Sequence, residues 1–330
     1  MDDADFAGQL IALGAPERTR DLVLGDLRVR VHGVTDDVAT TIEHALVEPD
    51  RTHPVATVHH VTGPAPAPPW SPEDCLVRDQ VRGRTSGRFR ALYRPDVPSL
   101  SFADLESATG VLWHRSTDGL PARESAAPFA PLLSWLLAAH GLRMTHGAVV
   151  GHERGAVLLA GPAGAGKTTT TLACVRSGLR TTGEDYVVVD VDRHEGLAAY
   201  DAAKLGDFAL DRFPEARPHV RGTSEQGKAV VALTDVFPGS LAARLPLRAI
   251  VVPRVSARTG SRPVPLPAAV ALRALSAGSL VQLAGDDARM LAQLAALTRA
   301  LPSFVLDVGP DLEAIAPALE PLLSGRTEAA

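Results

Sequence analysis

Several residue types are scarce in this sequence, and each shortage narrows the classes of protein that it can encode. Only two of the 330 residues are cysteines, Cys75 and Cys174, which excludes a disulfide-stapled fold and favours a reducing compartment. No apolar run reaches the roughly 20 residues of a membrane span, and the N-terminus, MDDADFAGQL, is acidic and has no apolar core of a secretion signal. We therefore expect a cytoplasmic protein with no membrane segment.

Aromatic residues and lysines are also scarce. Aromatic residues make up 4% of the chain, and lysines are few beside abundant Ala, Arg, Pro and Val, a composition typical of a GC-rich genome. The formal net charge of −5 gives no overall basic bias toward nucleic acid. Arginines gather at residues 82–94, but interleaved Gly, Ser and Thr favour a solvated loop there. We expect neither a nucleic-acid nor a membrane partner.

The length and the 45% hydrophobic content are sufficient for two domains. Residues 22–31 alternate around a Gly-Asp turn and predict a hairpin, residues 36–46 have helical spacing, and short strands are expected at 89–93 and 110–113. No catalytic pattern accompanies them. We predict a small α+β module over residues 1–125, with a role in substrate recognition, and a nucleotide-binding domain over residues 126–330.

The second half predicts alternating helices and strands. An amphipathic helix is expected at residues 128–142, a strand at 144–150 and a buried strand at 156–160. Further strands are predicted at 179–182, 186–191, 229–233, 249–253 and 304–308. Helices are predicted at 168–176, 268–276, 287–300 and 312–323.

A glycine-rich loop carries the strongest functional signal. Residues 161–168, GPAGAGKT, match the phosphate-loop pattern G-x-x-x-x-G-K-[ST] between the buried strand and a helix. Glycines let successive N–H groups point at phosphate oxygens, and the helix N-terminus adds partial positive charge. Lys167 would bridge the β- and γ-phosphates, and the Thr168 hydroxyl would hold Mg²⁺. The residues expected around the nucleotide are Gly161, Ala163, Gly164, Ala165, Gly166, Lys167, Thr168 and Thr169.

Acidic residues after this helix allow two interpretations. In a conventional phosphate-loop NTPase, the apolar run at 187–189 would end in a magnesium-binding acid, Asp190. Alternatively, Glu184 and Asp185 end the strand at 179–182 and serve an acceptor hydroxyl and the metal. Only the second interpretation places its acidic residues, Glu184 and Asp185, directly after a strand that runs toward the phosphates. The residue pattern alone leaves both open.

Three segments together resemble the catalytic domain of HPr kinase/phosphorylase and its relatives. Residues 145–150 (THGAVV), 161–168 and 183–185 (GED) correspond to the family's His-Gly strand, phosphate loop and Asp-Asp pair. The resemblance covers residues 143–192 well and the rest of the C-terminal half loosely. It is greatest for the stand-alone HPr-kinase-like enzymes of bacterial peptide-maturation clusters, which include lasso-peptide precursor kinases. It rests there on residues 146–148, 183–186, 200–205, 227–229 and 278–283.

The resemblance implies an α/β fold with a P-loop nucleotide domain of the HPr-kinase and phosphoenolpyruvate-carboxykinase type. Glu184 stands where the family has its catalytic base, although its side chain is longer than the Asp found there. Asp185 would partner His146 and bind the metal, beside the catalytic Lys167. Lysines and an arginine within or after apolar stretches are possible phosphate contacts; they are Lys204, Lys228 and Arg254.

These features predict an ATP- and Mg²⁺-dependent kinase. The expected acceptor is a Ser or Thr hydroxyl of a peptide precursor or small protein; a small hydroxyl metabolite is the alternative. A nucleotide-dependent switch or ATPase is the rival from another class, and it would need no base near the γ-phosphate. The Glu-Arg-Gly-Leu-Gly type of signature by which HPr kinase/phosphorylases hold metal and protein substrate is missing, so we do not expect HPr itself as the substrate.

Overall fold

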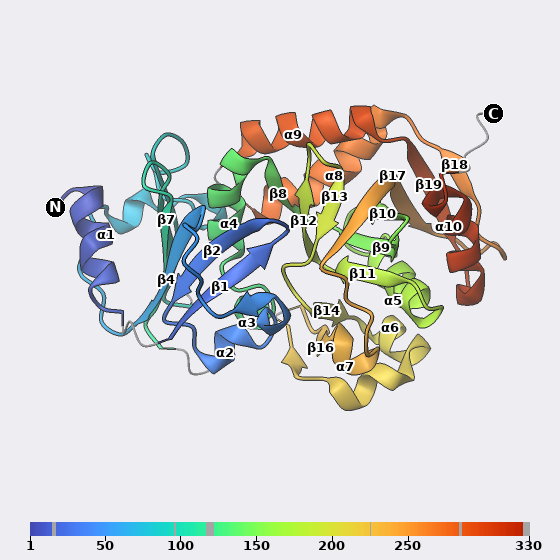
Figure 1. The fold of residues 1–330 in the computed structure, drawn as a ribbon, viewed down its shortest axis with the longest axis horizontal. Helices are drawn as coiled ribbons and strands as arrows, with labels where there is room; N and C mark the ends of the chain where they lie inside the picture. The colour runs from blue at the N-terminus through green and yellow to red at the C-terminus, as the bar shows by residue number, and fades with distance from the viewer. Residues whose placement is uncertain (15–17, 96, 117–121, 225, 284–285, 326–330) are drawn as a thin grey trace. The chain divides into compact units, whose positions relative to one another are not determined.

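The computed structural model describes residues 1–14, 18–95, 97–116, 122–224, 226–283 and 286–325. It has a mixed α/β fold in two compact units (Figure 1). Met1–His140 and Val281–Ala288 form the first unit, and Gly141–Leu280 and Arg289–Ala330 form the second. The units therefore divide after His140 rather than near residue 125.

The first unit is built on a seven-stranded mixed sheet with the order β3-β1-β2-β4-β7-β6-β5. Strands β2, β4 and β7 are parallel, and the remaining neighbours are antiparallel. The strands are β1 (Thr19–Leu24), β2 (Leu27–His32), β3 (Leu46–Val47), β4 (Ala56–Thr62), β5 (Phe89–Arg94), β6 (Ser99–Asp104) and β7 (Thr109–His114). The hairpin β1–β2 and strands β5 and β7 confirm the sequence prediction.

Short helices accompany this sheet. They are α1 (Asp3–Ile11), α2 (Asp36–Ala39), α3 (Ala122–Ala126) and α4 (Ala130–Leu136), with 3₁₀ turns η1 (Glu43–Ala45), η2 (Pro72–Asp74), η3 (Val77–Asp79) and η4 (Leu137–His140). Helix α4 packs against β6 and β7, which is why the first unit extends to His140. From α1, Phe6 meets Phe102 of β6 edge to face, with ring centroids 5.6 Å apart.

Two predicted helices are shorter than expected. The helix expected at 36–46 ends at Ala39, because the consecutive β-branched residues Thr40, Thr41 and Ile42 fit a helix poorly. The chain then enters η1 and β3. The helix expected at 128–142 is α4 followed by the 3₁₀ turn η4, and Gly141, at φ 75°, ends it.

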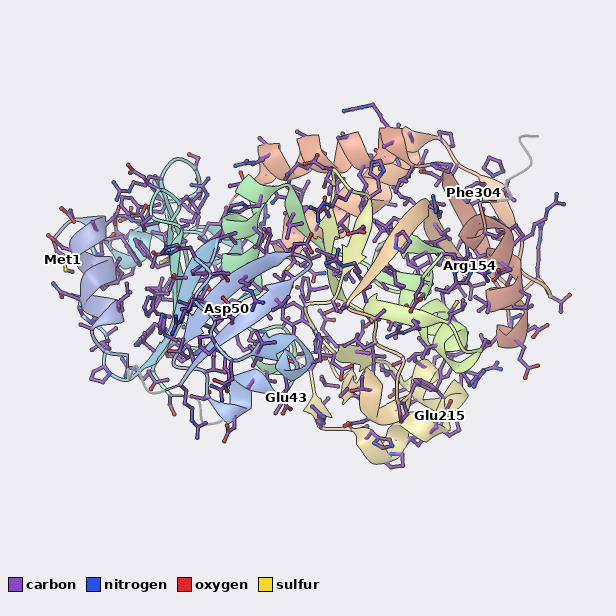
Figure 2. All side chains as sticks on the ribbon, in the orientation of Figure 1. Met1, Glu43, Asp50, Arg154, Glu215 and Phe304 are labelled. Carbon is purple, nitrogen blue, oxygen red and sulfur yellow. The ribbon has the colours of Figure 1, made fainter. Side chains whose placement is uncertain are left out.

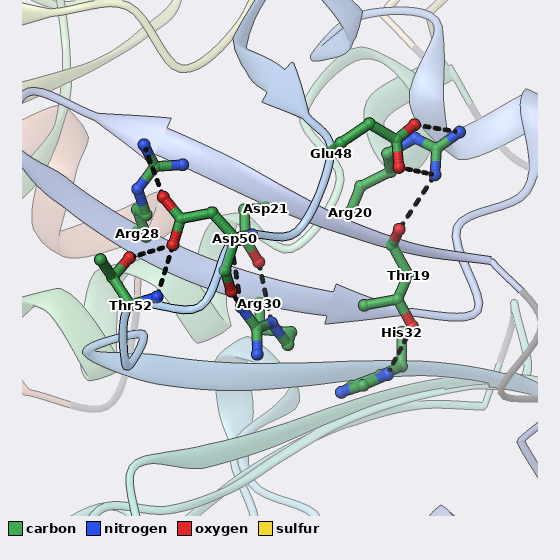
Figure 3. A network of polar contacts seen from close by, with 9 residues as sticks. All are labelled: Thr19, Arg20, Asp21, Arg28, Arg30, His32, Glu48, Asp50 and Thr52. Atoms are coloured by element: carbon green, nitrogen blue, oxygen red, sulfur yellow. Dashed lines mark hydrogen bonds and ion pairs between the residues drawn. The ribbon is translucent and has the colours of Figure 1, made fainter.

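A polar network joins β1 and β2 to the segment after β3 (Figure 3). Asp21 is fully buried and accepts two hydrogen bonds from the Arg30 guanidinium, at 2.9 and 3.1 Å. The same guanidinium donates to the backbone carbonyl of Asp50, whose carboxylate pairs with Arg28. A bidentate pair of this kind satisfies the buried carboxylate and fixes the strand register.

The second unit has a nine-stranded sheet with the path β11-β9-β10-β17-β13-β12-β8, and β19 joins β17 to β18. Its strands are β8 (Leu142–His146), β9 (Ala148–His152), β10 (Gly155–Leu159), β11 (Arg180–Gly183), β12 (Tyr186–Asp190), β13 (Glu195–Leu197), β17 (Arg244–Val255), β18 (Pro263–Pro265) and β19 (Ser303–Val308). Strands β10, β17 and β19 are parallel. Strand β11 runs in the same direction as β10, since both are antiparallel to β9.

A separate sheet with the order β14-β16-β15 and several helices complete this unit. The three strands are β14 (Ala202–Leu205), β15 (Gly222–Thr223) and β16 (Ala229–Ala232). The helices are α5 (Lys167–Arg176), α6 (Asp207–Arg212), α7 (Leu233–Val236), α8 (Ala268–Gln282), α9 (Asp287–Ala300) and α10 (Ile315–Leu323), with 3₁₀ turns η5 (Pro214–His219) and η6 (Leu312–Ala314).

One predicted strand is wrong. Residues 144–150 form two strands, β8 and β9, which separate at Gly147 and pair with different neighbours. Only glycine fits at this break, because a Cβ on Gly147 would lie 2.8 Å from the carbonyl oxygen of Leu159. The break sends β8 to β12 and leaves His146 at the end of a strand.

The core of the second unit packs α5 and α10 against the parallel strands. Its buried members include Leu159 of β10, Val251 of β17, Leu172 of α5 and Leu319 of α10. Figure 2 draws the side chains on this ribbon, including Phe304 of β19, which belongs to the same cluster. Among the described residues, no helix is both long and apolar enough to cross a bilayer.

Candidate functional site

The glycine-rich loop joins β10 to α5 in the arrangement that the sequence predicts. Gly161, Gly164 and Gly166 have φ values of 150°, 81° and 104°, which side chains other than glycine's rarely allow. A Cβ on Gly166 would lie 3.7 Å from Pro253 of β17 and 3.8 Å from Val308 of β19. The loop therefore lies at the carboxyl ends of the parallel strands, where open α/β sheets bind their ligands.

Lys167 folds back over this loop. Its ammonium donates to the carbonyl oxygens of Gly161, at 2.6 Å, and Pro162, at 3.2 Å. Burial lowers the pKa of Lys167, and the positive charge of Lys228 adds to this, whereas Glu184 and Asp185 oppose it. An ammonium has three N–H donors, so two carbonyl contacts leave one for an anion in the loop.

Glu184 follows the end of β11 and is 3% exposed. Its carboxylate accepts hydrogen bonds from the Thr168 hydroxyl in the first turn of α5 and from the backbone N–H of Lys204 on β14. Burial raises the pKa of Glu184 to about 7, the charge of Asp185 adds to this, and the hydrogen bond from Thr168 opposes it. A carboxyl group with this pKa can exchange a proton near neutral pH.

Asp185 occupies the opposite electrostatic environment. One of its oxygens lies 3.4 Å from Nε2 of His146, and the other accepts a 2.7 Å hydrogen bond from the Lys204 ammonium. Burial alone would raise the pKa of Asp185, but the hydrogen bond with His146 and the charge of Lys204 outweigh it and lower the pKa well below its usual range. Its φ of 71° is a left-handed conformation that Asp tolerates better than most residues.

His146 is held from the side of α8. Its backbone N–H donates to the Ser279 hydroxyl at 3.0 Å, and Ser279 donates in turn to the carbonyl oxygen of Leu275. A Cβ on Gly278 would lie 2.2 Å from Nδ1 of His146, so only glycine lets the helix approach the ring this closely. The sequence analysis gave Gly278 and Ser279 no role; a Gly-Ser step inside an apolar helix was the available signal.

Asp190, the magnesium-binding acid of a conventional phosphate-loop NTPase, lies at the far end of β12 from His146. Strand β12 begins at Tyr186, opposite His146, and ends at Asp190, opposite Leu142. Asp190 is four residues along the strand from Tyr186, which corresponds to roughly 13 Å. Its carboxylate accepts the backbone N–H groups of Asp192 and Arg193 and so caps a turn.

Two of the three predicted phosphate contacts interact with groups of the candidate site. Lys204 binds Asp185, and the charge of Lys228 acts on Lys167. Arg254 instead pairs with Asp307 of β19 at 2.6 Å and is largely exposed. Side chains alternate along β17, so Arg254 lies on the face opposite to Pro253, beside which the loop lies. We do not retain Arg254 as a phosphate contact.

Comparison with known proteins finds similarity to this chain among solved structures. No family model matches it, and a search of curated proteins finds no match. Among solved structures it is similar to the HPr(Ser) kinase/phosphatase from Coxiella burnetii, with 8% identity, 54% of this chain and 88% of that chain covered, and a TM-score of 0.30. A likeness of this size carries no argument about activity, so the function has to be argued from the site.

Proposed function

We propose that this protein is a kinase that transfers the γ-phosphoryl group of ATP to a Ser or Thr hydroxyl of a peptide precursor or small protein. The observation that carries the proposal is the contact between Glu184 and Thr168. It holds a buried carboxyl group with a raised pKa against the first turn after the phosphate loop. A nucleotide-binding switch would have no use for a proton acceptor there.

The chemistry assigned to each residue follows from its contacts. The acceptor oxygen forms a bond to the γ-phosphorus, the bond from phosphorus to the β,γ-bridging oxygen breaks, and ADP leaves. Glu184 takes the hydroxyl proton. Lys167 and the loop backbone hold the β- and γ-phosphates, while Asp185, fixed by His146, stays ionised and orients the acceptor.

The residues present also fit a magnesium ion, which would neutralise phosphate charge when bound. Mg²⁺ prefers oxygen ligands and usually takes only one or two from the protein, with the rest from phosphates and water. Within the described residues no group of three or more His, Cys, Asp or Glu could hold a metal, which agrees with such a sparse site. Thr168 supplies the hydroxyl oxygen nearest the loop, while Glu184 is kept for the acceptor proton. Asp185, our sequence-based choice, is engaged by Lys204 and His146.

The peptide acceptor is supported by the resemblance of short segments, such as residues 183–186 and 200–205, to peptide-maturation kinases, and by the first unit. That unit carries a sheet and core of its own and none of the residues assigned to the chemistry. We propose that it recognises the acceptor, in a cytoplasmic setting.

Four variants test the function in an assay of ADP release with Mg²⁺-ATP and a degenerate Ser/Thr peptide library. We expect Lys167→Ala to abolish turnover. Glu184→Gln and Asp185→Asn should each lower it on the order of a hundred- to ten-thousand-fold, the usual cost of a lost base, with ATP affinity kept. Asp190→Asn is the matched control and should change turnover little, because asparagine can still accept the turn's N–H groups.

Two results would contradict the proposal. ADP release that does not depend on any added acceptor would favour an ATPase or switch, and release that depends on free small alcohols alone would favour a metabolite kinase. Normal turnover by Glu184→Gln would remove its assigned role as the base.

A further inference from the structure

All three lysines of this chain lie at one site. The sequence has 33 lysines and arginines, and only Lys167, Lys204 and Lys228 are lysines. The other members of this set are all arginines. Among the described residues, Lys204 with Asp185 is an ion pair made by a lysine, and every other ion pair of a lysine or arginine with a carboxylate uses arginine. A composition that replaces lysine nearly everywhere yet keeps it at three converging positions indicates that these positions need an ammonium.

The two lysines outside the loop come from one small sheet. Lys204 lies on β14, opposite Val230 of β16. Lys228 directly precedes β16, where its carbonyl oxygen accepts the N–H of Ser224 and so continues the pairing of β15 with β16. Because side chains alternate, Lys228 has the same parity as Val230 and therefore lies on the face that carries Lys204. The sheet thus presents two ammonium groups from one face.

Both groups act electrostatically on the loop and its carboxylates. The charge of Lys228 lowers the pKa of Lys167, and strand register places Lys228 on the sheet face that carries Lys204. Lys204 is bound by Asp185 at 2.7 Å, and its backbone N–H holds Glu184. Three cations around one loop repel each other, and such a cluster becomes favourable when a polyanion lies between them.

The difference between lysine and arginine explains the selection. An ammonium is a compact point charge with three rotatable donors on a flexible stem, whereas guanidinium is a wide planar fork. The planar guanidinium of arginine suits ion pairs with carboxylates at the protein surface. Beside the loop, Glu184 and Asp185, a compact charge on a flexible stem can contact phosphate oxygens on different phosphorus atoms.

We propose that Lys167, Lys204 and Lys228 form one polyphosphate clamp that requires an ammonium at each position, with Lys204 passing from Asp185 to the transferred phosphoryl group. This inference rests on the proposed function, since it deepens the same nucleotide site. Once Lys204 leaves, Asp185 keeps its contact with His146. The small sheet β14-β16-β15 is then the element that completes the phosphate site.

The scarcity of lysine makes the clamp directly testable in the full-length wild-type protein. Acetic anhydride acetylates amines, so the three lysines and the α-amino group are its amine targets, and peptide mass spectrometry reads each one. We expect Mg²⁺-ATP to lower acetylation of all three lysines at least severalfold, while AMP, which has no β- or γ-phosphate, protects none. The variant Arg221→Lys adds a reference lysine beside β15, away from the clamp, whose acetylation ATP should not change.

Kinetics of charge-conserving variants give the second test. Lys204→Arg and Lys228→Arg keep the charge and should still lower turnover more than tenfold, whereas Arg221→Lys, the reverse exchange at a surface pair with Asp235, should not. Protection of Lys167 without protection of Lys204 and Lys228, or full turnover by both arginine variants, would overturn the clamp and leave the kinase proposal intact. No protection of Lys167 and no ADP release by the wild type would instead overturn the kinase proposal.

Discussion

Two adjacent carboxyl groups, Glu184 and Asp185, differ in environment more than any other pair in the site. Among the described residues, the donors to Glu184 are neutral, the Thr168 hydroxyl and a backbone N–H, and burial of Glu184 favours its protonated form. Asp185 contacts the Lys204 ammonium and His146, which favour the ionised form. Neighbouring acids whose pKa values are driven apart divide the work of base and electrostatic partner.

This division predicts a pH dependence of the rate. With a pKa of about 7, Glu184 becomes protonated below neutral pH and loses its ability to accept the hydroxyl proton. We expect kcat/KM to fall about tenfold per pH unit below pH 7 and to level off above it. The profile of the wild type, measured with a fixed peptide acceptor, checks this. A flat profile from pH 5 to 8 would exclude Glu184 as the base.

The same pKa predicts a dependence of stability on pH. The folded protein holds the Glu184 proton more tightly than the unfolded chain does, so the free energy of unfolding falls as pH rises from about 4.5 to about 7, by at most about 1.4 kcal/mol per unit. Glu184→Gln removes the titrating group. Its Tm relative to wild type should therefore be higher at pH 8 than at pH 4.5, whereas an equal difference at both values would contradict the buried acid.

At the scale of elements, helix α8 determines the position of the His146 ring. Gly278 allows the close approach, and Ser279 holds the backbone of His146 at the end of β8. The helix thereby acts on Asp185 through the histidine. Strand β11 and the loop after β10 converge on the same place because both strands point toward it.

Two glycine-to-alanine changes in helices should therefore have opposite effects. At Gly278 the added Cβ displaces the His146 ring, so Gly278→Ala should lower the free energy of unfolding by about 1–3 kcal/mol and reduce turnover. At Gly8 of α1 the added Cβ meets nothing within 4 Å, and Gly8→Ala should stabilise by roughly 0.5–1 kcal/mol. Chemical denaturation measures both. An unchanged Gly278→Ala protein would contradict the role of α8.

At the scale of the whole molecule, the two units each have their own sheet and hydrophobic cluster. Every residue proposed to bind ATP or move a proton belongs to the second unit. The first unit instead contributes buried polar networks such as Asp21 with Arg30, which stabilise a sheet. This placement supports the proposed division, in which the second unit performs the chemistry and the first unit recognises the acceptor.

Hydrogen exchange with mass spectrometry checks the division. Mg²⁺-ATP should slow amide exchange in residues 161–169, 183–186 and 224–228, because bound phosphates order the loop and its surroundings. Residues 1–140 should be unchanged, and a phosphorylatable peptide should slow exchange there. Lys167→Ala is the control in which ATP has no effect. ATP protection spread equally over both units would contradict the assignment.

The sequence by itself determined the local structure. A strand, a glycine loop and the helix at 167–176 were predictable because periodicity and glycine conformations act over a few residues. The same holds for the hairpin β1–β2 and for β11, β16, β19 and α9. Placement of Glu184 and Asp185 after β11 was also predictable, since it needed only strand direction.

Only the tertiary structure decided which residues meet. Gly147 lies so close to the carbonyl oxygen of Leu159 that no side chain fits at the break between β8 and β9. Lys204 meets Asp185 only because a separate sheet, β14-β16-β15, carries it there, and Arg254 is directed away from the loop by its partner Asp307. Each is a contact between segments far apart in the chain, and no local pattern encodes its partner. The role of Gly278 likewise becomes visible only when α8 lies against His146, because the ring leaves no room for a side chain at that position.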